Sequence, residues 1–209
     1  MFTGLIEATG RIERVDSLVH RSAQRESGQP SGRVLRVRTP LGGELKPGDS
    51  IAVSGVCLTV SSSDSGGFEA VVSPETLRVT TLLTASEGRL VNLERPLRAD
   101  GRFGGHFVLG HVDGVGRVTV MRPDGDCHWL EVETPAALGA LIIHKGSIAV
   151  DGISLTVADL SGSKVGAQIV PFMFAATALR EARPGDAVNL EADVIGKYVA
   201  RMLSAARQV

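Results

Sequence analysis

Two short runs of the chain alternate small nucleophilic or hydroxyl-bearing side chains with aliphatic ones. Cys57 and Thr59 alternate in this way in the first run, and Ser154 and Thr156 do so in the second. Because successive side chains of a β-strand point to opposite faces, each pair shares one face of its strand. Such a face could offer a thiol or hydroxyl and a second hydroxyl to a flat polar ligand. The same pattern also fits a half-buried strand whose polar face meets solvent.

The cysteine and histidine residues limit the chemistry that is available. Cys57 could act as a nucleophile only where a nearby cation or helix N-terminus favours its thiolate. His106 and His111 are five residues apart and no carboxylate cluster accompanies them, so we expect no metal site. His111 could contact a ligand or carry a proton, or it could be an ordinary strand histidine.

A third candidate follows the apolar run at residues 68–72. Ser73, Pro74, Glu75 and Thr76 come directly after it, where a strand ends and backbone groups are available to a ligand. Alternatively, Ser73 and Glu75 only cap a short helical turn.

The elements that must position these residues occur twice. Residues 50–60 and 147–157 are identical at eight of eleven positions, and residues 91–94 and 74–82 return at the same spacing as 188–191 and 171–179. The start of the chain is echoed from residue 109, at a longer spacing that indicates an insertion within residues 17–33. A period of this length predicts two whole domains, at 1–97 and 98–192, followed by a tail at 193–209.

Each repeat contains about six short β-rich runs separated by turn residues, which predicts a small antiparallel barrel and an all-β fold. The tail differs, because its apolar residues recur at helical spacing after a potential N-cap at Asp193. This apolar stripe must be buried against the barrels or against the same helix of another subunit. We expect the second arrangement.

Composition excludes several classes of protein. A net charge of −1 over 209 residues favours neither nucleic acid nor an anionic membrane as a partner. The two cysteines, Cys57 and Cys127, lack metal-type spacing and indicate reduced thiols in a cytoplasmic protein. We expect no signal peptide and no membrane span, because no long apolar run is present.

Several motifs together resemble riboflavin synthase of the α-chain type. They are MFTGLIE, GVCLTV, PETLRVTTL, VNLERP, GGHFVLGHVDGVG, KGSIAVDGISLTV and VNLEADVIGKYVAR, in one order over nearly the whole chain. The resemblance implies two tandem six-stranded antiparallel Greek-key β-barrels, each binding one 6,7-dimethyl-8-ribityllumazine, and a C-terminal α-helix that joins three chains into a homotrimer. The implied transferase activity is a dismutation of two lumazines to riboflavin and 5-amino-6-(D-ribitylamino)uracil, without cofactor or metal.

The resemblance also assigns site residues. It implies proton-transfer or polar catalytic roles for Cys57, Ser50, His111 and Asp193. It implies a first substrate pocket made of Gly4, Leu5, Ile6, Cys57, Leu58, Thr59, Val71, Val72, Ser73, Pro74, Glu75 and Thr76. It implies a second pocket made of Gly110, His111, Val112, Lys145, Ser154, Leu155, Thr156, Gln168, Ile169, Val170, Pro171, Phe172 and Met173.

Two residues depart from the family pattern. Met173 stands where the family usually has threonine, and Ser54 replaces the asparagine usual before Gly55. The first departure keeps open a non-catalytic lumazine- or flavin-binding protein of the same family. A flavin-dependent reductase barrel would need a nucleotide-binding βαβ domain, for which the sequence has no pattern.

Overall fold

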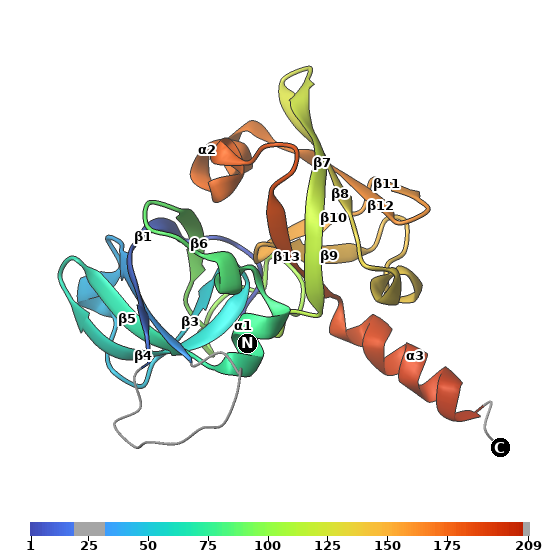
Figure 1. The fold of residues 1–209 in the computed structure, drawn as a ribbon. Helices are drawn as coiled ribbons and strands as arrows, with labels where there is room; N and C mark the ends of the chain where they lie inside the picture. Colours follow the sequence, from blue (N-terminus) through green and yellow to red (C-terminus); the bar gives the residue numbers. More distant parts are fainter. Residues whose placement is uncertain (19–31, 207–209) are drawn as a thin grey trace.

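The computed structural model of the chain describes residues 1–18 and 32–206. The expected insertion at 17–33 lies almost wholly outside these described residues. Two curved antiparallel sheets, one for each repeat, lie beside each other, and a helix at the end of the chain extends away from both (Figure 1). The expected all-β class with a C-terminal helix is confirmed.

The first repeat forms a closed barrel with the strand order β1-β2-β5-β4-β3-β6. Its strands are β1 (Ala8–Ser17), β2 (Arg33–Arg38), β3 (Ser50–Val53), β4 (Val56–Asp64), β5 (Gly67–Val72) and β6 (Leu90–Glu94). Strands β3, β4 and β5 follow one another as hairpins, and β6 returns beside β3, which is the Greek-key order.

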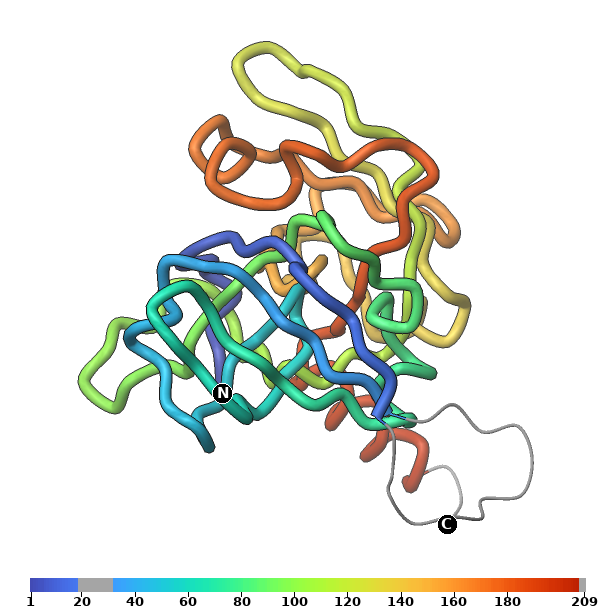
Figure 2. Tube along the Cα trace, turned by 60° about the vertical axis from the view of Figure 1, so that its left-hand side comes forward, coloured from blue at the N-terminus to red at the C-terminus, as the bar shows by residue number. Residues whose placement is uncertain are grey.

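The second repeat forms a seven-stranded sheet with the order β10-β9-β13-β7-β8-β12-β11. Its strands are β7 (Gly114–Asp124), β8 (Cys127–Glu133), β9 (Ser147–Val150), β10 (Ile153–Thr156), β11 (Asp159–Ser161), β12 (Lys164–Ile169) and β13 (Ala187–Ala192). The β7–β8 hairpin projects beyond the sheet (Figure 2).

The count of seven strands differs from the expected six because one strand is interrupted. β10 pairs with β9 and β11 pairs with β12, just as the two halves of β4 pair with β3 and β5. In the first repeat β4 stays continuous where it changes partner, with a register shift between Val60 and Ser62. In the second repeat the corresponding strand is divided, and Val157 and Ala158 separate β10 from β11. The two ends of this sheet are therefore adjacent in the chain, and the sheet is curled.

Alternation along the strands places one aliphatic core inside each sheet. Leu58 and Val60 on β4 point into the first core, whereas on the other face Cys57 is half-buried and Thr59 is exposed. Leu155 on β10 points into the second core, with Ser154 and Thr156 on the opposite face. The predicted polar faces are therefore confirmed as outer faces of the sheets.

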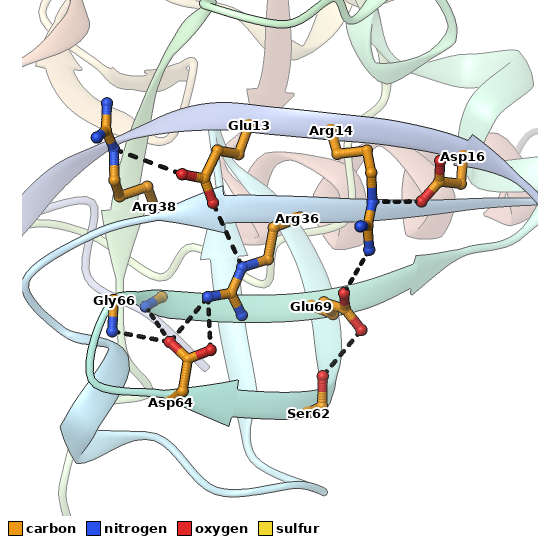
Figure 3. A network of polar contacts seen from close by, with 10 residues as sticks. Glu13, Arg14, Asp16, Arg36, Arg38, Ser62, Asp64, Gly66 and Glu69 are labelled. Atoms are coloured by element: carbon orange, nitrogen blue, oxygen red, sulfur yellow. Dashed lines mark hydrogen bonds and ion pairs between the residues drawn. The ribbon is translucent and has the colours of Figure 1, made fainter.

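The outer face of β1, β2, β4 and β5 carries a network of ion pairs (Figure 3). Arg36 binds Asp64 at 2.7 Å and reaches Glu13 at 3.5 Å, and Arg14 binds Glu69 at 2.8 Å. The Arg36 guanidinium holds the pKa of the Asp64 carboxyl below its ordinary value through their hydrogen bonds. Because its charges are already paired, this face is an ordinary solvated surface.

Short helices follow the equivalent strands of both repeats. α1 (Pro74–Val79) begins after Ser73, whose hydroxyl accepts a hydrogen bond from the Thr76 N–H and caps the helix. α2 (Pro171–Ala176) begins after Val170 and has no such side-chain cap. The 3₁₀ helices are η1 (Gly42–Glu44), η2 (Thr81–Thr84), η3 (Ala136–Leu141) and η4 (Ala178–Glu181).

The last helix, α3 (Val194–Ala206), begins at the predicted cap. The Asp193 carboxylate accepts a hydrogen bond of 2.9 Å from the Ile195 N–H, which satisfies a free donor of the first turn. No residue of α3 is buried, and its stripe of Ile195, Tyr198, Met202 and Leu203 is exposed. The chain itself therefore leaves this apolar stripe uncovered.

Two equivalent asparagines join the repeats crosswise. The Asn92 side chain donates to the Asp151 carbonyl at 2.9 Å and accepts from the Ala178 N–H at 2.7 Å. The Asn189 side chain donates to the Ser54 carbonyl at 2.8 Å and accepts from the Thr81 N–H, also at 2.8 Å. The contact between repeats is therefore reciprocal.

Asp151 breaks this symmetry, because its counterpart in the first repeat is Ser54. Its carboxylate accepts a hydrogen bond from the Asn189 N–H, and burial raises its pKa from 3.8 to about 6. Because the pKa of Asp151 is higher in the folded protein than in the unfolded chain, protonation of its carboxyl favours the folded state. This contribution to stability is complete below the unfolded pKa and is lost as the pH rises through about 6.

We therefore predict that Asp151→Asn stabilises the protein at alkaline pH. Asparagine keeps an acceptor for Asn189, tolerates the positive φ of 45° at this turn, and removes the buried charge. The gain in unfolding free energy should approach about 3 kcal/mol at pH 8 and shrink as the pH falls toward 4. Urea denaturation across this pH range measures it. A gain independent of pH would show that the carboxylate charge is not responsible.

Candidate functional site

The start of the chain crosses to the second repeat. Phe2 pairs with Val108, and the Gly4 carbonyl accepts a hydrogen bond of 2.8 Å from the Ser154 N–H. Ile6 packs against the core of the second repeat, not the first. The segment 2–6 therefore lies against β10 and the candidate residue Ser154.

The corresponding segment of the second repeat crosses in the opposite direction. The Gly110 carbonyl accepts a hydrogen bond of 2.9 Å from the Cys57 N–H, and Val112 packs against the core of the first barrel. The sequence-based grouping placed Gly4, Leu5 and Ile6 with Cys57, and Gly110, His111 and Val112 with Ser154, whereas the structure places Gly4 against Ser154 and Gly110 against Cys57. The two segments are exchanged, because each is held by the other repeat's strand.

Glycine is required at both crossings. A Cβ atom on Gly4 would lie 2.6 Å from the Ser154 Cβ, and one on Gly110 would lie 2.6 Å from the Cys57 Cβ. Both glycines also have a positive φ, of 78° and 77°, which favours glycine. The candidate residues are thus packed directly against the backbone of the exchanged segments.

Two buried glutamates hold the exchanged segments in place. Glu94 accepts hydrogen bonds from the Thr3 N–H at 2.6 Å, the Thr3 hydroxyl at 2.8 Å and the Gly4 N–H at 2.9 Å. Burial, the largest influence, raises the pKa of the Glu94 carboxyl.

Glu191 has the same role in the second repeat, where it accepts from the backbone of Leu109, Gly110 and His111. Burial likewise raises the pKa of the Glu191 carboxyl. Sequence analysis did not assign these residues to the site, although the repeated Val-Asn-Leu-Glu motif contains them.

Cys57 lies at the first crossing as a neutral thiol. Burial is the main cause that raises its pKa, and the positive charge of the N-terminus and a hydrogen bond with the Ser50 side chain only partly oppose this. Because a nucleophilic cysteine needs a lowered pKa, the environment of Cys57 suits hydrogen bonding and packing, not attack by a thiolate. The structure thus brings together Cys57, Ser50 and the Gly110 segment.

Ser154 lies at the second crossing with a histidine beside it. A hydrogen bond of 2.7 Å joins the Ser154 Oγ to the His106 Nδ1, and His106 is only 6% exposed. Sequence analysis considered His106 only as a metal ligand. Its proximity to Ser154 depends on the exchange of segments, so no spacing in the sequence could have indicated it.

The strand ends that were expected to hold a ligand differ between the repeats. The Thr76 hydroxyl lies 2.9 Å from that of Ser73, within the cap of α1. In the second repeat Met173 is half-buried and packs against the core, and Phe172 is 83% exposed. The second strand end is therefore more apolar than the first.

Lys145 lies at a strained turn close to the β10 strand. It has a positive φ of 63° and donates its N–H to the Val157 carbonyl at 2.8 Å. The equivalent residue of the first repeat is Gly48, which adopts the same backbone region without strain. The second repeat therefore presents an exposed lysine at a left-handed position that glycine occupies in the first repeat.

Among the described residues, the side chains of the remaining candidates, Asp193 and His111, form no hydrogen bond with Cys57 or Ser154. Asp193 caps α3. Burial lowers the pKa of His106, and the negative charge of Asp193 partly offsets that decrease. The His111 side chain is exposed, while its N–H is bound by Glu191. Within the described ranges, no group of three or more His, Cys, Asp or Glu residues could hold a metal ion.

Comparisons with known proteins agree with this duplicated arrangement. The lumazine binding domain family matches residues 3–96 and again residues 109–193. A riboflavin synthase of Actinobacillus pleuropneumoniae is 41% identical, over 97% of this chain and 90% of the relative. Riboflavin synthases of Bacillus subtilis and Mycobacterium bovis are each 38% identical, over 100% and 99% of this chain and 92% and 100% of theirs.

A solved structure of LumP complexed with riboflavin shares the fold. Its TM-score is 0.80 at 20% identity, over 92% of this chain and 99% of LumP. LumP complexed with 6,7-dimethyl-8-(1'-D-ribityl) lumazine gives a TM-score of 0.77 at the same identity and coverage.

The exchange predicts that a change in one segment loosens the other repeat. Gly110→Ala should loosen β4 around Cys57, and Gly4→Ala should loosen β10 around Ser154, because the added methyl group meets those strands. Left-handed strain and overpacking together should lower the unfolding free energy by roughly 2–4 kcal/mol.

Hydrogen exchange resolved by peptide measures the effect on each strand separately. Gly125→Ala is the matched control, since its φ is also positive and its added methyl group would meet no neighbouring atom. Loosening of β10 by Gly110→Ala would contradict the exchanged arrangement.

Proposed function

The chain belongs to the riboflavin synthase family, and from that membership we propose that it transfers a four-carbon unit between two molecules of 6,7-dimethyl-8-ribityllumazine. The products are riboflavin and 5-amino-6-(D-ribitylamino)uracil. The riboflavin synthase relatives are 36–41% identical over nearly the full chain. This full-length similarity favours the catalytic activity over the non-catalytic alternative.

The observation that carries the proposal is the equivalence of the two crossings. Cys57 and Thr59 on β4, and Ser154 and Thr156 on β10, occupy the same positions in two copies of one fold, each against a glycine of an exchanged segment. A reaction between two identical molecules needs two similar pockets. The duplicated crossings supply candidates for both.

Positioning of the two substrates would be the main catalytic device. Holding two reactants in a reactive geometry can remove on the order of 7–11 kcal/mol of activation free energy. The neutral Cys57 thiol supports this view, since its environment favours a hydrogen-bonding group. The proton transfers of the reaction then fall to polar groups at the pockets and to water.

We further propose that α3 joins three chains, so that the first barrel of one chain faces the second repeat of its neighbour. The exposed stripe on α3 supports association, and so does the groove of about 530 Å³ that α3 forms with Leu141 and Ile143. A homotrimer would cover apolar surface that the single chain leaves open.

We also propose a cytoplasmic location. The two free cysteines support it, because disulfides are rare in proteins of that compartment.

Turnover of lumazine alone tests the proposed activity. Purified protein incubated with 6,7-dimethyl-8-ribityllumazine should form riboflavin and the ribitylaminouracil in equal amounts, followed by fluorescence and chromatography. Lumazine binding without riboflavin formation would instead support the non-catalytic alternative.

Substitution in the exposed stripe tests the assembly. Met202→Glu places a charge within the apolar stripe of α3 and should reduce the homotrimer to smaller species, with loss of turnover. Arg201→Glu, at an exposed neighbouring position of the same helix, is the matched control and should leave the trimer intact. Light scattering measures both. A trimer that survives Met202→Glu would contradict assembly through this stripe.

A further inference from the structure

His106 and Ser154 form a pair whose hydrogen-bond direction is determined by burial. The His106 Nδ1 lies 2.7 Å from the Ser154 Oγ, and its other ring nitrogen, Nε2, is buried without a hydrogen-bond partner among the described residues. Only one of the two nitrogens carries a proton in a neutral imidazole. Burial lowers the pKa of His106, so the neutral form is favoured.

The two tautomers leave different groups unsatisfied. If Nδ1 accepted from the serine hydroxyl, the single N–H would stand on Nε2, buried and without an acceptor. If Nδ1 carries the proton and donates to the Ser154 Oγ, only a lone pair on Nε2 is unused. A buried donor without a partner is the less favourable of the two, so the Nδ1–H tautomer is preferred.

The backbone around His106 holds this geometry firmly. The His106 N–H donates to the Thr3 carbonyl at 3.1 Å, and Thr3 is itself bound by the buried Glu94. Gly105 is required beside His106, because a Cβ atom there would overlap the Thr3 carbonyl oxygen and lie 3.2 Å from the Ser154 Cβ. The imidazole is therefore fixed on one side of the Ser154 side chain.

We propose that His106 is a positioning residue that donates its Nδ1–H to Ser154, so that the Ser154 hydroxyl donates its own proton to the ligand. Ser154 is half-buried, and its hydroxyl proton can then point away from the imidazole, along the face of β10 that the exposed Thr156 shares. The second site then takes a hydrogen-bond acceptor at this point, such as a ring carbonyl oxygen or ring nitrogen. The inference rests on the proposed function, because it identifies which atom of the lumazine or flavin ring meets Ser154.

The first site lacks this device. Cys57, the counterpart of Ser154, has the Ser50 hydroxyl as its hydrogen-bond neighbour and carries a weak S–H donor. The two sites therefore present donors of different strength at equivalent points, so they distinguish two otherwise identical ligands.

The tautomer itself is testable without any ligand. Nitrogen-15 NMR of the imidazole in the full chain should show His106 protonated at Nδ1 and unprotonated at Nε2. Ser154→Ala should shift the population away from this tautomer. An Nε2–H tautomer in the parent protein would overturn the inference, even if riboflavin synthesis is confirmed.

A double-mutant cycle tests the coupling, with riboflavin as the probe. His106→Leu and Ser154→Ala should each raise the dissociation constant of riboflavin at the second site about three- to tenfold. The double variant should bind no more weakly than either single variant, because the same donated hydrogen bond is lost in each case. His106→Asn places an amide N–H near the former Nδ1 and should remain within about twofold of the parent. Cys57→Ala, which alters the first site, should combine additively with His106→Leu.

Full additivity of His106→Leu with Ser154→Ala would overturn the inference, since the histidine would then not act through the serine. Equal weakening by His106→Asn and His106→Leu would also overturn it. If the parent protein binds no riboflavin at all, the proposed function fails, and the NMR measurement alone decides the role of His106.

Discussion

The exchange of segments between the repeats is the constraint on which the candidate sites depend. Each segment is anchored at one end by a buried glutamate of its own repeat and ends against a strand of the other. Glu94 and Glu191 satisfy several backbone N–H groups at once, and groups of this kind would be costly to bury unpaired. Removing either carboxylate would therefore disturb the site on the opposite repeat.

The exchange also explains why the two repeats form one functional unit. Neither Cys57 nor Ser154 is enclosed by its own repeat, because the glycine against it comes from the other. The crosswise Asn92 and Asn189 hydrogen bonds hold the repeats in the register that this packing requires. One repeat alone would lack one wall of its site.

Within this symmetric frame, single residues make the two halves chemically different. Asp151 replaces Ser54 at the interface, Lys145 replaces Gly48 at a left-handed turn, and Ser154 replaces Cys57 at the crossing. Each replacement adds charge, strain or a stronger donor on the second repeat alone. Such differences are what a reaction between two copies of the same molecule requires, because the copies must play different parts.

The sequence by itself determined the duplication, the strand alternation that places Cys57 and Ser154 on outer faces, the cap at Asp193 and the family, because these depend on local spacing and motif identity. Only the tertiary structure decided which segment meets which strand. Gly4 meets Ser154, Gly110 meets Cys57 and His106 reaches Ser154 through pairing across residues far apart in the chain. No local pattern encodes such pairings, since a segment at the edge of a repeat can satisfy its backbone groups on either neighbouring sheet.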